Sequence, residues 1–294
     1  MLYVLAPVFN RVKITLQFLE LLEQQHDKEF KVVVIDDGST DGTAEKIKEH
    51  YPHVHLVNGD GSWWWTRSVN EGIRYCLRFE DCNMILLMND DTYFYPDYIS
   101  SIKKAYKQVP GHVVGSISLT YEEPHRIFFS GVKKFKLLTN RGCLYHKPFE
   151  LVDNVDLSGL KVSKALPGRG ILIPTSIIRK YGLFDEKNLP QYGADFSYVT
   201  NLARKHGVDS YISWDSRLYT FTKLTGAGSS FTGESLSSFL KSFFKPMSRQ
   251  YLPDQWQVCK VRFGPWLAIP ALPLAMVRNL YGYFKRRNTL ITDG

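Results

Sequence analysis

Residues 33–43 read Val33-Val34-Ile35-Asp36-Asp37-Gly38-Ser39-Thr40-Asp41-Gly42-Thr43, an apolar run that leads directly into carboxylates. Residues 84–92, Met84-Ile85-Leu86-Leu87-Met88-Asn89-Asp90-Asp91-Thr92, repeat this arrangement about fifty residues later. Short runs of Val, Ile and Leu predict strands buried on both faces, as in a parallel sheet. Because open α/β sheets bind ligands at the carboxyl ends of their strands, the two clusters predict a site there for a divalent metal and a phosphorylated ligand.

The pattern around these runs alternates between strands and helices. We expect strands at 2–6, 30–35, 53–57 and 84–88, with helices at 13–25, from 42, at 70–77 and from 96 to 106. The second half predicts strands at 113–119, 126–129, 133–138, 166–174 and 211–214 and helices at 175–181 and 198–206. This order predicts an α/β fold with a mixed, mostly parallel central sheet flanked by helices.

Composition sets further bounds. With 294 residues, 44% of them hydrophobic, the chain can form one large α/β domain or a domain with an appendage. Its four cysteines (Cys76, Cys82, Cys143, Cys259) are scattered and form no CxxC pair, which argues against a disulfide scaffold or a zinc site. The chain starts directly on a strand pattern, so we expect no signal peptide and a cytoplasmic location.

The net charge of +8 is concentrated near the C-terminus. Residues 241–294 contain nine Lys or Arg and two Asp, whereas residues 1–240 are close to neutral and lack a basic stripe, so nucleic-acid binding is not expected. Residues 263–277 are apolar and aromatic, too short to span a bilayer, and hold three prolines that should break a helix. We predict peripheral contact with the inner face of the cell membrane; a packing helix or a homodimer contact is the alternative.

The first acidic cluster can bind a nucleotide. Asp36 or Asp37 could accept hydrogen bonds from a nucleobase imide or a ribose hydroxyl, while Gly38 lets a ligand approach the backbone. A helix cap with a turn is the alternative, and it would explain one or two of the aspartates.

The second acidic cluster can bind a cation. Alternate side chains of an extended segment share a face, so Asn89 and Asp91 point the same way and Asp90 differently. Their oxygens suit Mg²⁺ or Mn²⁺, which would neutralise a diphosphate. A surface acidic turn is the alternative.

Two further stretches are candidates. Asp195 precedes the expected helix at 198–206 and could act as a general base or as a simple N-cap. Residues 63–65 are three tryptophans in what we expect to be an extended loop, where neighbours point to different sides. One or two of them could stack on a base or sugar with Arg67 near phosphate; core packing with a surface arginine is the alternative.

The ordered set of motifs resembles the family-2 glycosyltransferases of the GT-A fold. It comprises Ala6-Pro7-Val8-Phe9-Asn10, the two acidic clusters, and Phe184-Asp185-Glu186 leading to Tyr192-Gly193-Ala194-Asp195. The stretch Gly59-Asp60-Gly61-Ser62-Trp63-Trp64-Trp65-Thr66 with Asn70-Glu71-Gly72 is most similar to the rhamnosyltransferase-type branch. The resemblance covers about residues 1–225.

This resemblance implies inverting transfer from a nucleotide-diphosphate sugar, with a metal that stabilises the departing charge. It implies Asp195 as the base, Asp91 and Asn89 as ligands of Mg²⁺ or Mn²⁺, and Arg169, Gly170 and Tyr192 at the acceptor. The donor would contact Pro7, Val8, Phe9, Asn10, Asp36, Asp37, Trp65, Arg67, Asn70 and Asp90. By this resemblance residues 1–110 form the nucleotide-binding half-sheet and 111–225 the acceptor-binding half of the same domain. Past Gly226 the composition changes to Ser, Phe and Lys, so we expect residues 226–294 to form a C-terminal helical appendage.

The chain departs from the family pattern in three places. Asn89 replaces the first acidic metal ligand, and Ala194 leaves Asp195 as the single carboxylate of an acidic pair. Residues 218–223 contain no histidine where many relatives have a metal ligand, so metal affinity should be low, and Lys223 could supply positive charge instead.

The sequence thus predicts a bacterial glycosyltransferase of surface-polysaccharide synthesis that uses dTDP-rhamnose or a UDP-sugar and a glycan or lipid-linked acceptor. A sugar nucleotidyltransferase is one alternative, but residues 7–11 are not the glycine-rich, cationic loop that binds triphosphate. A degenerate, non-catalytic sugar-binding protein is another; the joint presence of Asp36, Asp37, Asp91 and Asp195 counts against it.

Overall fold

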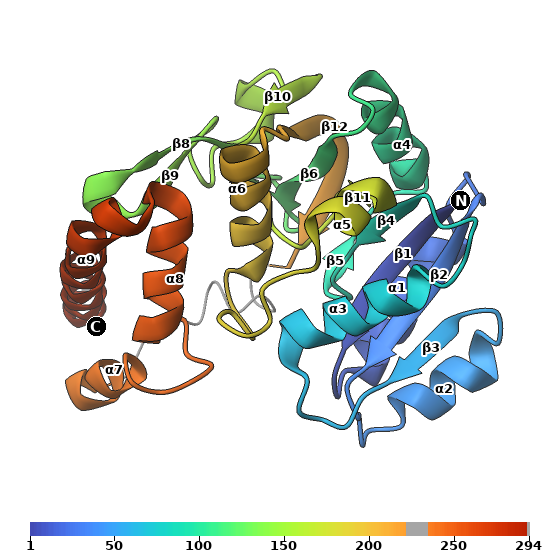
Figure 1. Ribbon diagram of the computed structural model, residues 1–294, viewed down its shortest axis with the longest axis horizontal. Coiled ribbons are helices and arrows are strands. Elements are labelled where there is room, and N and C mark those ends of the chain that lie inside the picture. Colours follow the sequence, from blue (N-terminus) through green and yellow to red (C-terminus); the bar gives the residue numbers. More distant parts are fainter. Residues whose placement is uncertain (222–234, 293–294) are drawn as a thin grey trace.

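A computed structural model describes residues 1–221 and 235–292, with side chains up to residue 284. A sheet with the strand order β10-β12-β6-β11-β4-β1-β2-β3 runs through the molecule. Figure 1 shows helices on both of its faces and the C-terminal helices at the end far from β1, β2 and β3. The predicted mixed, helix-flanked sheet is confirmed.

In the N-terminal half, strands alternate with helices, as the sequence predicts. Its strands are β1 (Leu2–Val8), β2 (Phe30–Asp36), β3 (His55–Asn58) and β4 (Met84–Leu87), and all their mutual pairings are parallel. Val8 pairs with Asp36, and Asp36 with Asn58, so their carboxyl ends form one rim. The connecting helices are α1 (Val12–Glu23), α2 (Thr43–His50) and α3 (Trp64–Cys76).

Two apolar clusters fix which helices cover each face. Alternate residues of β1 and β2 pack against α3 on one face and against α1, α2 and α4 (Tyr98–Gln108) on the other. Tyr3 and Ile35 belong to the first cluster, and Val4 and Val34 to the second. Because alternate side chains of these strands are buried on opposite faces of the sheet, the strand ends that form the rim are held in place from both sides.

The second half makes the sheet mixed. β11 (Ile171–Pro174) is antiparallel to both β4 and β6 (Val113–Thr120), whereas β12 (Ser210–Thr220) is parallel to β6. The remaining strands are β5 (Thr92–Tyr93), β7 (Ile127–Phe129), the hairpin β8 (Val132–Lys136) and β9 (Arg141–Leu144), and β10 (Leu160–Val162). Helices α5 (Thr175–Tyr181) and α6 (Ala194–His206) follow β11.

Two helices begin earlier than predicted. α3 starts at Trp64, not at residue 70, so the expected extended tryptophan loop is wrong: Asp37 accepts hydrogen bonds from the N–H groups of Trp63 and Trp64 and caps this end. α6 starts at Ala194, because Gly193 takes a left-handed conformation (φ 83°) and its carbonyl accepts from Ser197 N. Asp195 therefore lies inside the first turn of α6 rather than before it.

The C-terminal segment forms α7 (Leu236–Ser242), α8 (Leu252–Phe263) and α9 (Pro265–Thr292). The expectation that prolines break this region is wrong, because α9 continues through Pro270 and Pro273. Both prolines are exposed, while Ala268, Ala271 and Ala275 on other faces of the helix are buried, so packing supports the helix despite the lost hydrogen bonds. Within the described residues, no helix is long and apolar enough to cross a membrane.

Candidate active site

A cavity of about 260 Å³ opens at the rim beside Asp37. It is lined by Pro7, Val8, Phe9, Arg11, Asp37, Gly61, Trp64, Trp65, Ser68 and Gln191. Phe9 and Trp64 are 49% and 45% exposed, so two aromatic faces are available here for a base or sugar. Trp64 also has a positive φ of 58°, a strained backbone for a bulky residue, and such strain often occurs at ligand sites.

Asp37 has a structural task at this cavity. Its carboxylate accepts hydrogen bonds from the N–H groups of Gly61, Trp63 and Trp64 at 3.0–3.2 Å. Asp36 is 2% exposed and accepts from Ser39 N at 2.9 Å. Both aspartates therefore shape the loops around the cavity, and of the two only Asp37 lines it.

Asn10 belongs to the supporting structure of the same loops. It has a φ of 51°, its N–H donates to Ser39 Oγ, and its Oδ1 accepts from Thr40 N. Asn10 thus ties the turn after β1 to the loop after β2, while residues 7–9 face the cavity.

Two arginines contact the second acidic cluster. Arg11 Nη1 lies 2.7 Å from Asp90 Oδ1, and Arg11 Nη2 lies 3.6 Å from Asp91 Oδ2. Asp90 also accepts from Thr15 Oγ1, and burial raises the pKa of Asp90 to about 6 despite Arg11. Arg169 Nη2 approaches Asp91 Oδ1 at 4.0 Å. Asp90 is thus a buried structural partner of Arg11.

In the second acidic cluster, Asp91 has one carboxylate oxygen that could contact a cation. Among the described residues, Asp91 Oδ1 is buried without a hydrogen-bond partner, which fits a metal or ligand contact. Asn89 Oδ1 lies 3.4 Å from Trp65 Nε1. No group of three His, Cys, Asp or Glu in residues 1–221 and 235–292 is placed to hold a metal, and Lys223 lies outside these ranges. Among the described residues, Asp91 and Asn89 are therefore the candidates for such a site.

A second cavity, of about 390 Å³, contains Asp195. Its lining combines Asn89, Asp91, Arg169, Tyr192, Asp195 and Arg249 with Trp65, Phe128, Pro167, Gly168, Gln191, Gly193 and Phe196. Trp65 and Gln191 line both cavities, so they form the wall between the cavity beside Asp37 and the cavity that contains Asp195.

Asp195 is held by backbone donors. Gly168 N donates to Asp195 Oδ2 at 2.7 Å, and Phe196 N donates to Asp195 Oδ1 at 2.8 Å. Burial raises the pKa of Asp195 above its ordinary value, although these two bonds and Arg169 oppose the shift. A raised pKa makes the ionised carboxylate a stronger base.

Besides Asn10, Asp36 and Asp90, three more predicted residues lie outside both cavities. Arg67 stacks on the Trp63 ring at 5.4 Å. Asn70 is buried and joins α3 to the backbone of Phe184 through bonds in both directions. Gly170 has a φ of 70° and fits closely against Leu218 and Tyr98. All three therefore hold the walls in place.

The sequence interpretation missed several lining residues. Arg11 follows the expected turn directly, and its charge next to Asn10 was an available signal. Gln191 and Gly168 flank residues that were singled out, yet only the fold shows that they meet at Trp65. Arg249 comes from the C-terminal segment, and no local pattern connects it with Asp195.

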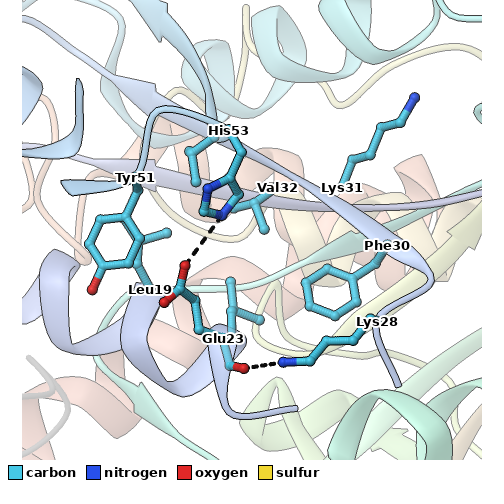
Figure 2. A pocket seen from close by; sticks show the side chains of 10 residues that line it. Leu19, Glu23, Lys28, Phe30, Lys31, Val32, Tyr51 and His53 are labelled. Carbon is cyan, nitrogen blue, oxygen red and sulfur yellow. Dashed lines mark hydrogen bonds and ion pairs between the residues drawn. The ribbon is translucent and has the colours of Figure 1, made fainter. Parts of the chain in front are cut away.

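A further cavity, of about 510 Å³, lies elsewhere, around the start of β2 and the end of α1. Figure 2 shows that its polar groups contact one another: His53 faces Glu23 at 3.4 Å, and Lys28 donates to the Glu23 carbonyl. It is thus at the opposite end of these strands from the acidic rim.

The fold is similar to that of solved GT-A glycosyltransferases. GalNAc-T7 with UDP, GalNAc and Mn²⁺ superposes with a TM-score of 0.63 at 11% identity, over 89% of this chain and 47% of that chain. TarS residues 1–349 from S. aureus give 0.54 at 13% identity, over 95% and 90%. The mannosyltransferase PcManGT from Pyrobaculum calidifontis with GDP-Man and Mn²⁺ gives 0.53 at 13%, over 99% and 79%.

The family follows from the sequence profile of glycosyl transferase family 2, which matches residues 3–153, and the chain belongs to this family. An uncharacterized glycosyltransferase of Rickettsia bellii (strain RML369-C) is 44% identical over 45 residues. That match spans 15% of this chain and 6% of the relative's length.

Proposed function

We propose that this chain is an inverting glycosyltransferase that moves a sugar from a nucleotide-diphosphate donor to an acceptor hydroxyl. The observation that carries the proposal is the pair of cavities that share Trp65 and Gln191, one beside Asp37 and the other containing Asp195. Donor and acceptor bound on either side of this wall would meet near Asp91 and Asp195. Family membership favours this reaction over a nucleotidyltransferase or a non-catalytic protein.

In this proposal the first cavity holds the nucleotide. Phe9 and Trp64 offer stacking surfaces, and Arg11 offers a cation for the diphosphate. We propose dTDP-rhamnose or a UDP-sugar as donor; the rhamnosyltransferase-like assignment rests on the sequence of residues 59–72.

The second cavity would hold the acceptor against Asp195. Ionised Asp195 takes the proton of the acceptor hydroxyl as its oxygen attacks the anomeric carbon from the face opposite the diphosphate, which departs with the bonding electrons. The hydrogen bonds from Gly168 N and Phe196 N fix the carboxylate, while Arg169 and Tyr192 line the acceptor side. Inversion follows because there is a single displacement.

Mg²⁺ or Mn²⁺ belongs to the proposal as the donor-side cation. Two structurally similar glycosyltransferases contain Mn²⁺ together with a nucleotide or nucleotide sugar. Asp91 Oδ1 and Asn89 would hold the ion, and donor phosphates and waters would complete its coordination. Bound there, it would neutralise charge on the leaving diphosphate.

We further propose a glycan or lipid-linked acceptor in bacterial surface-polysaccharide synthesis at the inner face of the cell membrane. The division into residues 1–110, 111–225 and 226–294 stays part of this proposal, with its last boundary among residues 222–234 outside the described chain. Support for membrane contact comes from the basic C-terminal segment and from exposed apolar side chains on α9.

The test is a thermal-shift panel of UDP-, dTDP- and GDP-sugars, with and without Mn²⁺, followed by assays of donor turnover. A binding donor at one hundred times its Kd should stabilise the fold by about 2.7 kcal/mol. If no nucleotide sugar binds or turns over under any condition, the transferase proposal is wrong.

A further inference from the structure

The C-terminal segment contributes a charged residue to the acceptor cavity. Arg249 lies between α7 and α8, yet it lines the same cavity as Asp195. Its guanidinium packs over the Tyr192 ring at 5.2 Å. The segment therefore does more than extend the molecule toward a membrane or a second subunit.

The position of Arg249 is fixed by the surrounding backbone. Gln255 Nε2 donates to the Arg249 carbonyl at 2.7 Å, and Tyr251 N donates to the Ser248 carbonyl at 3.0 Å. Next to it, the side chain of Gln250 accepts a hydrogen bond from Asn279 of α9. The guanidinium thus projects from an anchored turn.

Helix α8, which follows the turn, is held against the part of the protein that carries Asp195. Gln257 of α8 donates to Asp185 at 2.9 Å, and Arg204 of α6 donates to the Val261 carbonyl. Val258 belongs to the main apolar core and would lie 3.1 Å from a Cβ added at Gly193, two residues before Asp195. α8 therefore couples Arg249 to Gly193, the residue that leads into α6 and Asp195.

The charge of Arg249 is uncompensated by the described residues. No ion pair among residues 1–221 and 235–284 includes it, and the side chain is exposed. Asp91 and Asp195, the acids of this cavity, instead face Arg169. An exposed guanidinium held on an aromatic ring at a cavity mouth is suited to a phosphate, which it can bind through two parallel hydrogen bonds.

We propose that Arg249, supported by Tyr192, forms a phosphate subsite at the mouth of the acceptor cavity, so that the acceptor of the proposed transferase carries a phosphate ester. This inference rests on the proposed function, since it names the chemistry of the acceptor. The phosphate can belong to a lipid-linked acceptor or to a soluble sugar phosphate.

Calorimetric titration of the full chain with hexyl phosphate and with glucose 1-phosphate tests the subsite and separates the two sources. Arg249→Ala should weaken binding about ten- to hundredfold, the usual effect of losing charge-assisted hydrogen bonds, and Arg249→Lys should lie between. Lys245→Ala, an exposed cation of the same segment that does not line the cavity, should bind as the wild type does.

Tighter binding of hexyl phosphate supports a lipid-linked acceptor, and tighter binding of glucose 1-phosphate supports a soluble one. Unchanged binding in Arg249→Ala, or no binding of either probe to the wild type, overturns the subsite. Titrations of the same proteins with nucleotide sugars keep the two proposals apart. If the wild type binds no donor, the transferase proposal is contradicted. If the wild type binds a donor but neither phosphate probe, only the subsite is contradicted.

Discussion

At the scale of single residues, the proposed role of Asp195 as general base can be tested most directly. Asp195→Asn keeps the size of the side chain and one of the two oxygens that accept from Gly168 N and Phe196 N, but its amide cannot take a proton, so transfer should fall about 10²–10⁴-fold. Nucleotide-sugar affinity, measured by calorimetry, should stay within twofold because Asp195 does not line the donor cavity. Wild-type transfer rates in this variant would remove Asp195 as the base.

The pH dependence of transfer follows from the same residue. Burial raises the pKa of Asp195, and only the ionised form can accept the proton, so kcat/KM should rise with pH through a value above that of an exposed aspartate. Initial rates between pH 4 and 8 measure this limb. A limb at the ordinary value of 3.8 would contradict the assigned environment.

Gly168 is required by the close approach of Trp65. A Cβ at residue 168 would lie 2.4 Å from Trp65 Cζ2 and 2.6 Å from Cη2, so Gly168→Ala must displace the indole that separates the two cavities. We expect about 1–3 kcal/mol of lost stability and weaker donor binding. Trp65→Phe removes the clashing ring, so the double variant should recover much of the stability in urea unfolding; no recovery would point to another cause.

Arg11 and Asp90 form a pair that double-mutant cycles can isolate. Arg11→Ala leaves the buried Asp90 carboxylate without its closest cation, and because Arg11 is partly exposed we expect a loss of about 1–3 kcal/mol. Asp90→Asn in the same chain should reduce this loss. If the changes in unfolding free energy of the two single variants, measured in urea, add up to that of the double variant, the two side chains do not interact in solution. Arg67→Ala, which is away from Asp90 and Asp91, serves as the control.

At the scale of elements, α8 carries a buried acid in its first turn. Within the described residues Asp254 Oδ2 has no hydrogen-bond partner, and burial raises the pKa of Asp254 to about 6. Because the folded-state pKa exceeds the ordinary 3.8, its stabilising contribution is complete below pH 4 and is lost as the pH rises through 6. Asp254→Asn cannot ionise.

The free energy of unfolding of Asp254→Asn, relative to the wild type, should therefore increase by about 1–3 kcal/mol between pH 4 and pH 7.5. Urea titrations at both pH values measure this difference. A constant difference would show that Asp254 titrates alike in the folded and unfolded states.

Elements with strong local patterns were predictable, whereas their first turns were not. β2, β4 and α5 lie within a few residues of their predicted positions, because Val- and Ile-rich runs determine buried strands. The start of α3 depends on Asp37, which is 27 residues before Trp64, and the start of α6 depends on the left-handed Gly193. Such caps involve contacts that no local periodicity contains.

The candidate site divides in the same way. Asp37, Asp91 and Asp195 were predictable because acids after buried strands and before a helix follow a recognisable pattern, and all three line the cavities. Asp36, Asn10, Asn70 and Arg67 instead support the walls, since side-chain hydrogen-bond partners are set by tertiary contacts. Arg249 was not predictable, because it reaches Asp195's cavity only through the packing of α8 on α6.

At the scale of the whole molecule, α9 presents an apolar stripe. Trp266, Ile269, Val277 and Tyr281 are 82%, 58%, 66% and 68% exposed and recur at helical spacing, with the exposed Pro273 between them. Figure 1 places this helix at the end of the molecule far from β1, β2 and β3. Together with the basic charge of residues 241–294, the stripe fits the surface of an anionic membrane.

The role of the stripe can be tested by point substitutions. Deletion of residues 241–294 is less suitable, because it would also remove α8 and Arg249. Trp266→Ser with Tyr281→Ser should weaken co-sedimentation with phosphatidylglycerol-containing vesicles about tenfold or more, since each side chain loses apolar burial. Binding should also fall with salt and be weak on pure phosphatidylcholine. Phe149→Ser, an exposed aromatic outside α9, should bind vesicles like the wild type. If the double variant binds vesicles normally but a homodimer seen by light scattering dissociates, the stripe is a subunit contact and the membrane proposal is wrong.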